Sequence, residues 1–205
     1  MAPRAETRNR LLDAAIRTLA VEGYGGTTAR SIARTGGFAP GVIYYHFDDL
    51  EALLVTALRH TSQARMARYE EALGSCTDAA DLITRLRALY AEDMADKGHI
   101  DAVQELVTAS ATSPRLRAEV LAHVDSWSDF AASAVARLVE GTAFEELVPS
   151  RDIGMIAVAM FLGIQTLIHL DGDRSRIESL FAIAEPAAIL WDTFTGGGHK
   201  PNPDK

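Results

Sequence analysis

The sequence predicts an all-α protein of about nine helices. Alanine and leucine are abundant and runs of β-branched residues are scarce, a composition that favours helices. Apolar residues recur at spacings of three and four along most of the chain, which is the period of an amphipathic helix. Hydrophobic residues make up 48% of the 205 residues, which is ample for a core. Together these observations indicate helices packed on helices.

The distribution of charge divides the chain into a head and a body. Residues 1–47 contain six arginines and three acidic residues, a net charge of +3, whereas the remainder has a net charge of −11. A basic head can bind an anionic partner even though the whole chain carries −8. We therefore expect one domain at 1–47, a second at 48–195, and a disordered tail at 196–205.

The head is predicted to hold three helices. The first covers residues 4–22 and is capped by Gly23. The second covers 28–35 and ends at Gly36-Gly37, because glycine reaches positive φ without steric cost. The third is short and runs to His46, so neighbouring helices must hold it in place. The stretch from residue 28 to residue 47 therefore has the pattern of a helix-turn-helix motif.

The third helix presents residues suited to nucleic acid. Pro40 is tolerated in its first turn, where the missing N–H would have no partner in any case. Gly41 has no side chain, so another backbone or a base edge can approach closely. Tyr44, Tyr45 and His46 can donate hydrogen bonds to phosphate oxygens. In a helix-turn-helix unit this helix enters the major groove.

The remaining candidate DNA contacts come from the other two helices of the head. Arg4 lies at the start of the chain, where a flexible arm can reach a groove. Arg30 and Arg34 share the outer side of the second helix, and Thr27 or Thr28 caps its anion-favouring N-terminus. For the arginines an ordinary solvated face is the alternative. The predicted set is Arg4, Thr27, Thr28, Arg30, Arg34, Ala39, Pro40, Gly41, Tyr44, Tyr45 and His46.

A highly specific set of residues and spacings runs through the head and into the next helix. It comprises Thr27-Thr28, Ile32-Ala33, Gly37, Gly41, Ile43-Tyr44-Tyr45-His46-Phe47 and Glu51-Ala52-Leu53-Leu54. This pattern resembles the N-terminal signature of the TetR family of transcriptional regulators over about residues 8–58. The rest of the chain is similar to that family only in length and helical pattern.

The resemblance implies a ligand-responsive transcriptional repressor. A homodimer would bind a near-palindromic operator in double-stranded DNA, and a small-molecule effector bound in the body would release it. Three positions depart from the family pattern: Pro40 stands where a basic residue is frequent, Ala39 stands in place of a capping serine, and the third is Leu50. Leu50 stands where relatives often carry a lysine that meets a phosphate, and Asp48 and Asp49 precede it.

The body is predicted to contain six helices, at residues 48–73, 78–95, 100–110, 113–140, 153–170 and 174–194. Asp48 and Glu51 have the spacing of a capping box at the start of the first of these. That long helix connects the head to the body. It can transmit a tilt, which a flexible loop could not.

The last two helices carry more apolar surface than one chain can cover. Residues 153–170 are apolar almost all round, so a membrane span of about 20 residues is a rival interpretation. Polar positions such as Gln165 and His169 argue against it. The last helix has two stripes, one of which predicts a second subunit. The stripes are Ile177, Leu180, Phe181, Ala184, Ala188 and Trp191, and Ile183, Ala187, Leu190 and Phe194.

An effector pocket is expected between the helices at 78–140 and 151–170. The residue types there suit an apolar or aromatic molecule with one or two polar handles. Plain core is the alternative for each residue, and His123 in particular fits a core histidine with a local partner. No metal or cofactor is expected. The candidate set is Tyr90, Met94, Gln104, His123, Trp127, Phe130, Phe161 and Gln165.

No motif of a hydrolase, zinc enzyme, dinucleotide-binding enzyme or P-loop enzyme is present, so the chain is expected not to be an enzyme. A small helical enzyme or an adaptor that carries a helix-turn-helix is the alternative. Cys76 is the single cysteine, which excludes an internal disulfide, and no signal segment opens the chain. A cytoplasmic location is therefore expected.

Overall fold

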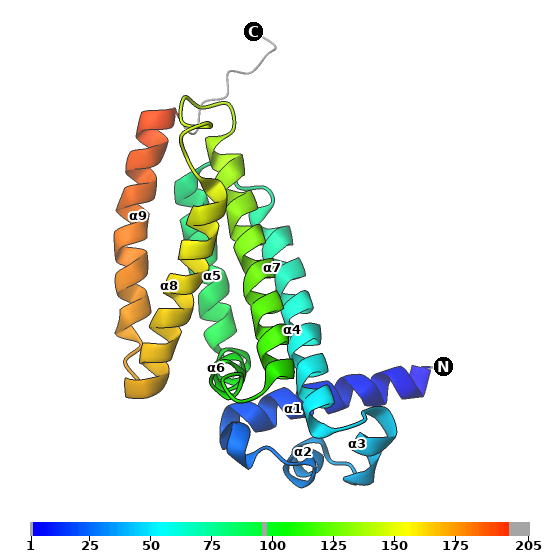
Figure 1. The fold of residues 1–205 in the computed structure, drawn as a ribbon. Helices are drawn as coiled ribbons and strands as arrows, with labels where there is room; N and C mark the ends of the chain where they lie inside the picture. The colour runs from blue at the N-terminus through cyan, green and yellow to red at the C-terminus, as the bar shows by residue number, and fades with distance from the viewer. Residues whose placement is uncertain (1, 96–97, 197–205) are drawn as a thin grey trace. The chain divides into compact units, whose positions relative to one another are not determined.

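The computed structural model describes residues 2–95 and 98–196, with side chains from residue 5 onward. Within these residues the chain forms nine α-helices and no strand, which confirms the predicted fold class (Figure 1). Apart from Gly196, the predicted tail lies outside the described residues. The helices are α1 (Ala2–Gly26), α2 (Ala29–Gly36), α3 (Gly41–His46), α4 (Leu50–Leu73), α5 (Ala79–Ala95), α6 (His99–Ala109), α7 (Pro114–Val139), α8 (Ser150–Asp171) and α9 (Ser175–Thr195).

The chain packs into two compact units, each built from two stretches of sequence. The first unit comprises Met1–Arg65 and Asp93–His123, and the second comprises Met66–Glu92 and Val124–Lys205. Helices α4, α5 and α7 each contribute to both units. These units are defined by which residues pack together, whereas the boundary predicted between residues 47 and 48 was placed at the end of the DNA-binding motif. That boundary stays a prediction.

The first unit is held together by fully buried aliphatic side chains from six helices. Burying one such side chain contributes about 1.5–3 kcal/mol relative to leaving it in water. Because α1, α2 and α3 all contribute, the short α3 is held by neighbours, as its length requires. The largest of these side chains are Leu11, Leu12, Leu19, Ile32, Ile43, Leu53, Leu54, Leu58, Leu106 and Leu116.

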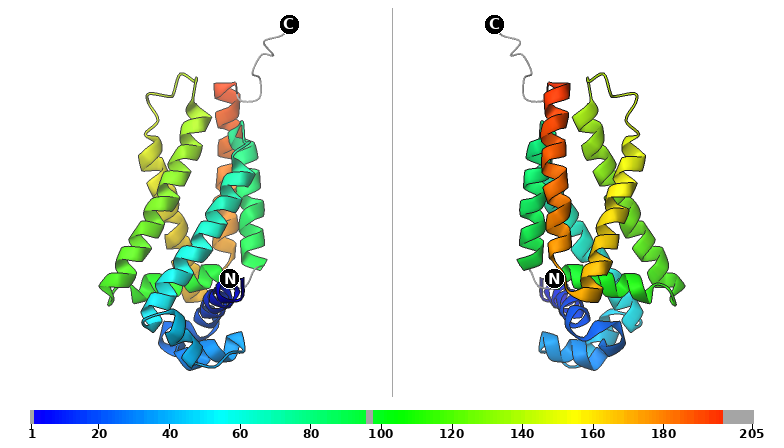
Figure 2. Two further views of the ribbon diagram at one scale, coloured as in Figure 1. Left: turned by 90° about the vertical axis from the view of Figure 1, so that its right-hand side faces the viewer. Right: turned by 90° about the vertical axis from the view of Figure 1, so that its left-hand side faces the viewer.

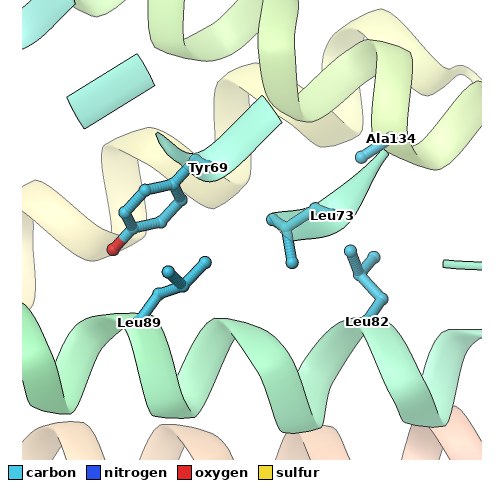
Figure 3. Close-up of a cluster of buried hydrophobic side chains, with 5 residues drawn as sticks. All are labelled: Tyr69, Leu73, Leu82, Leu89 and Ala134. Atoms are coloured by element: carbon cyan, nitrogen blue, oxygen red, sulfur yellow. The ribbon is translucent and has the colours of Figure 1, made fainter. Parts of the chain in front are cut away.

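The second unit has a core in which α4, α5 and α7 meet. Tyr69 and Leu73 of α4 face Leu82 and Leu89 of α5, with Ala134 of α7 beside them (Figure 3). Two partly buried aromatic rings of α7, Trp127 and Phe130, pack around Tyr69. Their ring centroids lie 5.1 and 6.5 Å from that of Tyr69 in edge-to-face geometry, a favoured aromatic arrangement.

Helix α9 is fastened to α5 at both ends. Its Asp192 carboxylate accepts hydrogen bonds from the backbone N–H groups of Ala79 and Ala80, both at 2.8 Å, and so caps the start of α5. Near the other end of α9, Arg87 of α5 pairs with Glu178 and Glu185 at 2.5 and 2.7 Å. Both views in Figure 2 show α9 running along α5. The inner face of α9 therefore packs against its own chain.

Most helix ends lie within two residues of the predicted positions, and the exceptions are the end of α1 and the start of α8, which is Ser150 rather than residue 153. Helix α1 continues past Gly23 to Gly26, with a break at Gly23. Helix α4 begins at Leu50, and Asp49 rather than Asp48 caps it, accepting a hydrogen bond from Ala52 N at 2.5 Å. The predicted capping box of Asp48 and Glu51 is therefore wrong, because Asp49 provides the cap and Glu51 accepts a hydrogen bond from Ser113.

Candidate nucleic-acid interface

The first helix of the motif, α2, starts with a complete capping box. Thr28 is the N-cap, and its hydroxyl accepts a hydrogen bond from Ser31 N at 3.1 Å. Ser31 Oγ in turn accepts one from Thr28 N at 2.8 Å. Two N–H groups that a helix start leaves without partners are thereby satisfied. Thr27, the other candidate cap, is buried instead, and its hydroxyl donates to Gly23 O at 2.7 Å.

The two glycines after α2 have different roles. Gly37 adopts φ +70 as the C-cap, and its N–H bonds to Ala33 O, so this position requires the left-handed conformation. Gly36 is helical. A Cβ on Gly36 would lie 1.9 Å from the ring of Phe38, so only glycine leaves room for that ring. The prediction that both glycines supply positive φ is therefore wrong for Gly36.

Helix α3 is anchored on one side and open on the other. Ile43 is fully buried and Phe47, at its C-cap, is 7% exposed. Tyr44 and Tyr45 are 60% and 69% exposed. A Cβ on Gly41 would meet nothing within 4 Å, so this face of α3 is free of other protein atoms. The arrangement presents two tyrosines on a helix that its buried residues fix.

Arginines surround the motif, and several have partners inside the protein. Arg34 pairs with Glu22 at 2.6 Å while its side chain stays 69% exposed. The guanidinium of Arg10 donates to Gly36 O at 3.3 Å, and that of Arg8 lies 5.3 Å from the centroid of the Phe47 ring. Arg30 is exposed on α2. The basic character predicted for the head is thus retained at its surface.

The acidic start of α4 is partly neutralised. Arg115 lies 3.2 Å from the Asp49 carboxylate, and Glu51 accepts a hydrogen bond from Ser113 at 3.0 Å. Sequence reasoning missed Arg115, because 66 positions separate it from Asp49 and no local pattern joins them.

Most of the predicted DNA-binding residues are accessible and lie on α2, on α3 or next to them. Thr28, Arg30, Arg34 and the residues from Ala39 to Gly41 are exposed, as are Tyr44 and Tyr45, and His46 is half-buried. The ring of His46 lies 5.1 Å from that of Tyr45. The side chain of Arg4 lies outside the described residues.

The predicted effector residues separate into several groups. Met94, Gln104 and His123 belong to the first unit, and the other five belong to the second. Trp127 and Phe130 pack on Tyr69. Tyr90 lies 6.0 Å from Phe161, ring to ring, and its hydroxyl accepts a hydrogen bond from the amide of Gln165 at 3.1 Å.

Two further observations bear on the effector residues. The half-buried His123 bonds to Ser62 through Nδ1, which is the kind of local partner expected of a core histidine. A surface hollow of about 550 Å³ lies beside the α7–α8 connection, and none of the predicted residues lines it. Its walls are Thr142, Ala143, Glu145, Glu146 and Leu147.

The motif and the helical body define a helix-turn-helix protein. Residues 11–57 match the family model described as "Bacterial regulatory proteins, tetR family". The HTH-type transcriptional regulator BetI of Burkholderia thailandensis is 30% identical over 89 residues, which are 43% of this chain and 45% of BetI. The match thus spans less than half the length of such curated relatives.

Solved structures are similar over nearly the whole chain. A TetR-family transcriptional regulator from Cytophaga hutchinsonii has a TM-score of 0.78 at 14% identity, covering 93% of this chain and 96% of its own. The regulator FadR from Bacillus subtilis, in complex with stearoyl-CoA, has a TM-score of 0.69 at 16% identity, covering 93% and 99%. At these identities they show the fold alone.

Residues 11–57 therefore match the DNA-binding region of the tetR family of bacterial regulatory proteins, and the described chain as a whole has the fold of TetR-family regulators. The resemblance predicted from the spacing around Tyr44, Tyr45 and His46 is confirmed. The match of residues 11–57 to a family of regulatory proteins supports the prediction that the chain is not an enzyme.

Proposed function

We propose that the chain is a DNA-binding transcriptional regulator that reads an operator with α3. The observation that carries this proposal is the pair of exposed tyrosines, Tyr44 and Tyr45, on a helix anchored by the buried Ile43. Phosphate contacts position a protein on the duplex and base contacts give specificity. The exposed residues of α2 and α3 supply groups for both phosphate contacts and base contacts. We leave Thr27 out of the proposed interface because it is buried.

The regulator acts as a homodimer through α8 and α9. The stripe of α9 that contains Phe181 faces its own core, where Ile177 is 2% and Phe181 8% exposed. The other stripe faces outward, with Ile183 71%, Leu190 59% and Phe194 78% exposed. Exposed apolar surface of this extent is typical of an interaction site. A second copy presenting the same stripe would bury it around a two-fold axis.

Helix α8 adds to that surface and also has the length and composition of a membrane span. The mean hydropathy of its most apolar 18-residue stretch is 2.0, and 17% of that stretch is buried. Two contacts favour packing over insertion: Gln165 bonds to Tyr90, and Gly154 lies against the α7 backbone. The exposed apolar residues of α8 then complete the dimer face. A cytoplasmic location follows from access to DNA.

A small apolar or aromatic effector would bind in the second unit near Tyr90. There the rings of Phe161 and Phe181 pack on the Tyr90 ring, and the Tyr90 hydroxyl bonds to the Gln165 amide, so apolar side chains lie beside two polar groups. The complex of FadR with stearoyl-CoA is an example of a relative in fold that binds an apolar chain. Effector binding would release the operator, which makes the regulator a repressor.

Selection of duplexes from a random pool tests the DNA-binding proposal. The wild-type protein should select a site with two half-sites of approximate inverted symmetry. Tyr44→Ala should weaken binding to the selected site about 30-fold, since one lost contact of about 1 kcal/mol in each of two subunits costs about 2 kcal/mol. Leu121→Ala truncates an exposed side chain of α7 and serves as the control. Failure to select any duplex would refute the proposed function.

A thermal-shift screen tests the effector site. Small hydrophobic compounds that raise the melting temperature of the wild-type protein should lose that effect with Gln165→Leu. An unchanged shift in this variant would place the ligand elsewhere.

A further inference from the structure

Helix α1 is broken one turn before its end. Gly23 has φ +69 and ψ 173, outside the helical range, and the chain then makes a further turn to Gly26. In an unbroken helix the N–H of Tyr24 would bond to the carbonyl four residues earlier. At this break it donates to Oε2 of Glu105, a residue of α6, at 2.8 Å. The carboxylate of one helix thus satisfies a backbone group of another.

The Glu105 contact lies directly before the DNA-binding motif. Thr27 N donates to Tyr24 O at 3.2 Å, and the Thr27 hydroxyl donates to Gly23 O at 2.7 Å. Thr28 follows as the N-cap of α2. The turn that Glu105 holds is therefore the turn from which α2 begins.

Helix α6 is fixed to the same part of α1 at a second point. Gly98, just before α6, has φ +132, and a Cβ built on it would lie 3.1 Å from Cβ of Ala20. Leu106 of α6 is fully buried in the first unit. His99, at the start of α6, also bonds to Thr61 of α4 at 2.8 Å. Helix α6 thus contacts both α1 and α4.

We propose that Glu105 is a positioning residue for DNA reading. By holding the Tyr24 backbone, Glu105 fixes the turn that precedes α2. A displacement of α6 would then shift the helix-turn-helix motif through its contact with α1 as well as through its contact with α4. The proposal rests on the DNA-binding function argued above. Gly23 is its structural counterpart, because any other residue at φ +69 is strained and its Cβ would lie 3.2 Å from Glu105 Oε2.

Three variants separate the hydrogen bond from the charge. Glu105→Ala removes both, Glu105→Gln keeps an acceptor oxygen, and Asp101→Ala removes an exposed carboxylate from the same helix. On the operator selected by the wild-type protein, Glu105→Ala should bind roughly tenfold more weakly. The other two should stay within about twofold of wild type. The Tyr24 amide should exchange faster in Glu105→Ala. Should that variant fail to fold, Glu105→Met preserves the volume without the acceptor.

Reciprocal coupling distinguishes positioning from a general loss of stability. Operator binding should slow amide exchange along α6 in the wild-type protein, and this protection should be lost in Glu105→Ala, because coupling between two sites acts in both directions. Wild-type affinity in Glu105→Ala, or no protection of α6 by operator, would overturn the inference. If the wild-type protein selects no duplex at all, the proposed function itself fails.

Discussion

Three polar contacts hold one turn of α4 inside the first unit. Each joins α4 to a different helix, and each places a polar group away from water. A buried polar group left without a partner costs about 1–3 kcal/mol, so the contacts are needed once these residues are present. They are the pairs Thr61–His99, Ser62–His123 and Arg65–Asp93.

His123 should make folding stability depend on pH. Its pKa is lowered from the ordinary 6.5 to about 4, chiefly by burial and also by the nearby Arg65 guanidinium, whereas Glu119 opposes the shift. Between these values the unfolded chain binds a proton that the folded protein excludes. Stability therefore rises with pH across this window and is lost as the pH falls from 6.5 towards 4. Between pH 6.5 and 5 the expected loss is about 2 kcal/mol.

Urea unfolding at pH 6.5 and pH 5 measures this effect. His123→Asn retains hydrogen-bonding capacity towards Ser62 but cannot titrate, so its loss of stability should be smaller than that of wild type by about 2 kcal/mol. His169→Asn alters an exposed histidine and should behave as wild type. Equal losses in wild type and His123→Asn would contradict the assignment.

At the scale of helices, α8 crosses α7 where a glycine allows close approach. A Cβ on Gly154 would lie 2.5 Å from Ala132 N and 2.6 Å from Ser128 O, both backbone atoms. Gly154→Ala should therefore push the helices apart and lower the free energy of unfolding by about 1–3 kcal/mol. Gly163, on the same helix, has nothing within 4 Å of its added Cβ.

Gly163→Ala is the matched control for that prediction. In a helix alanine is favoured over glycine by about 1 kcal/mol, so this variant should be as stable as wild type or more stable. Chemical denaturation of both variants gives the comparison. A Gly154→Ala variant as stable as Gly163→Ala would show that the α7–α8 crossing does not require glycine.

A substitution in the first turn of α4 tests the departure from the family pattern at Leu50. Leu50→Lys should add one phosphate contact per subunit. Each contact steepens log K against log[salt] by about 0.9, so the slope of the dimer should steepen by roughly 2. Leu50→Gln is the neutral control. Operator affinity across a salt series measures the slope, and an unchanged slope would mean that residue 50 does not face the DNA backbone.

Sequence patterns identified all nine helices of the described chain because apolar periodicity and caps are local. The cap of α4 was predicted wrongly, since the spacing to Glu51 favoured Asp48 and only contact geometry identifies Asp49. Contacts between distant positions left no sequence signal. The hydrogen bond from Tyr24 to Glu105 spans 81 positions. In the sequence Gly154 is only a glycine that interrupts an apolar helix, and the structure shows that it lies against the α7 backbone. The exposed site was predictable because its motif is contiguous.

For the whole molecule, the outward stripe of α9 is expected to decide both assembly and DNA affinity. Leu190→Glu places a charge on an apolar surface that a partner would bury, so it should give monomers with an intact helical spectrum. Phe181→Glu, on the buried stripe, should instead unfold the second unit. Thr84→Glu adds the same charge at an exposed position of α5 and should remain dimeric.

Loss of the dimer should also weaken operator binding. In a dimer the second head binds at high effective concentration once the first is bound, so separating the heads should lower affinity at least about 100-fold. A single head makes half the phosphate contacts, and the salt dependence of log K should fall to roughly half. Sedimentation and operator titration of Leu190→Glu test both effects. If Leu190→Glu and Phe194→Glu both stay dimeric, the interface lies on another surface.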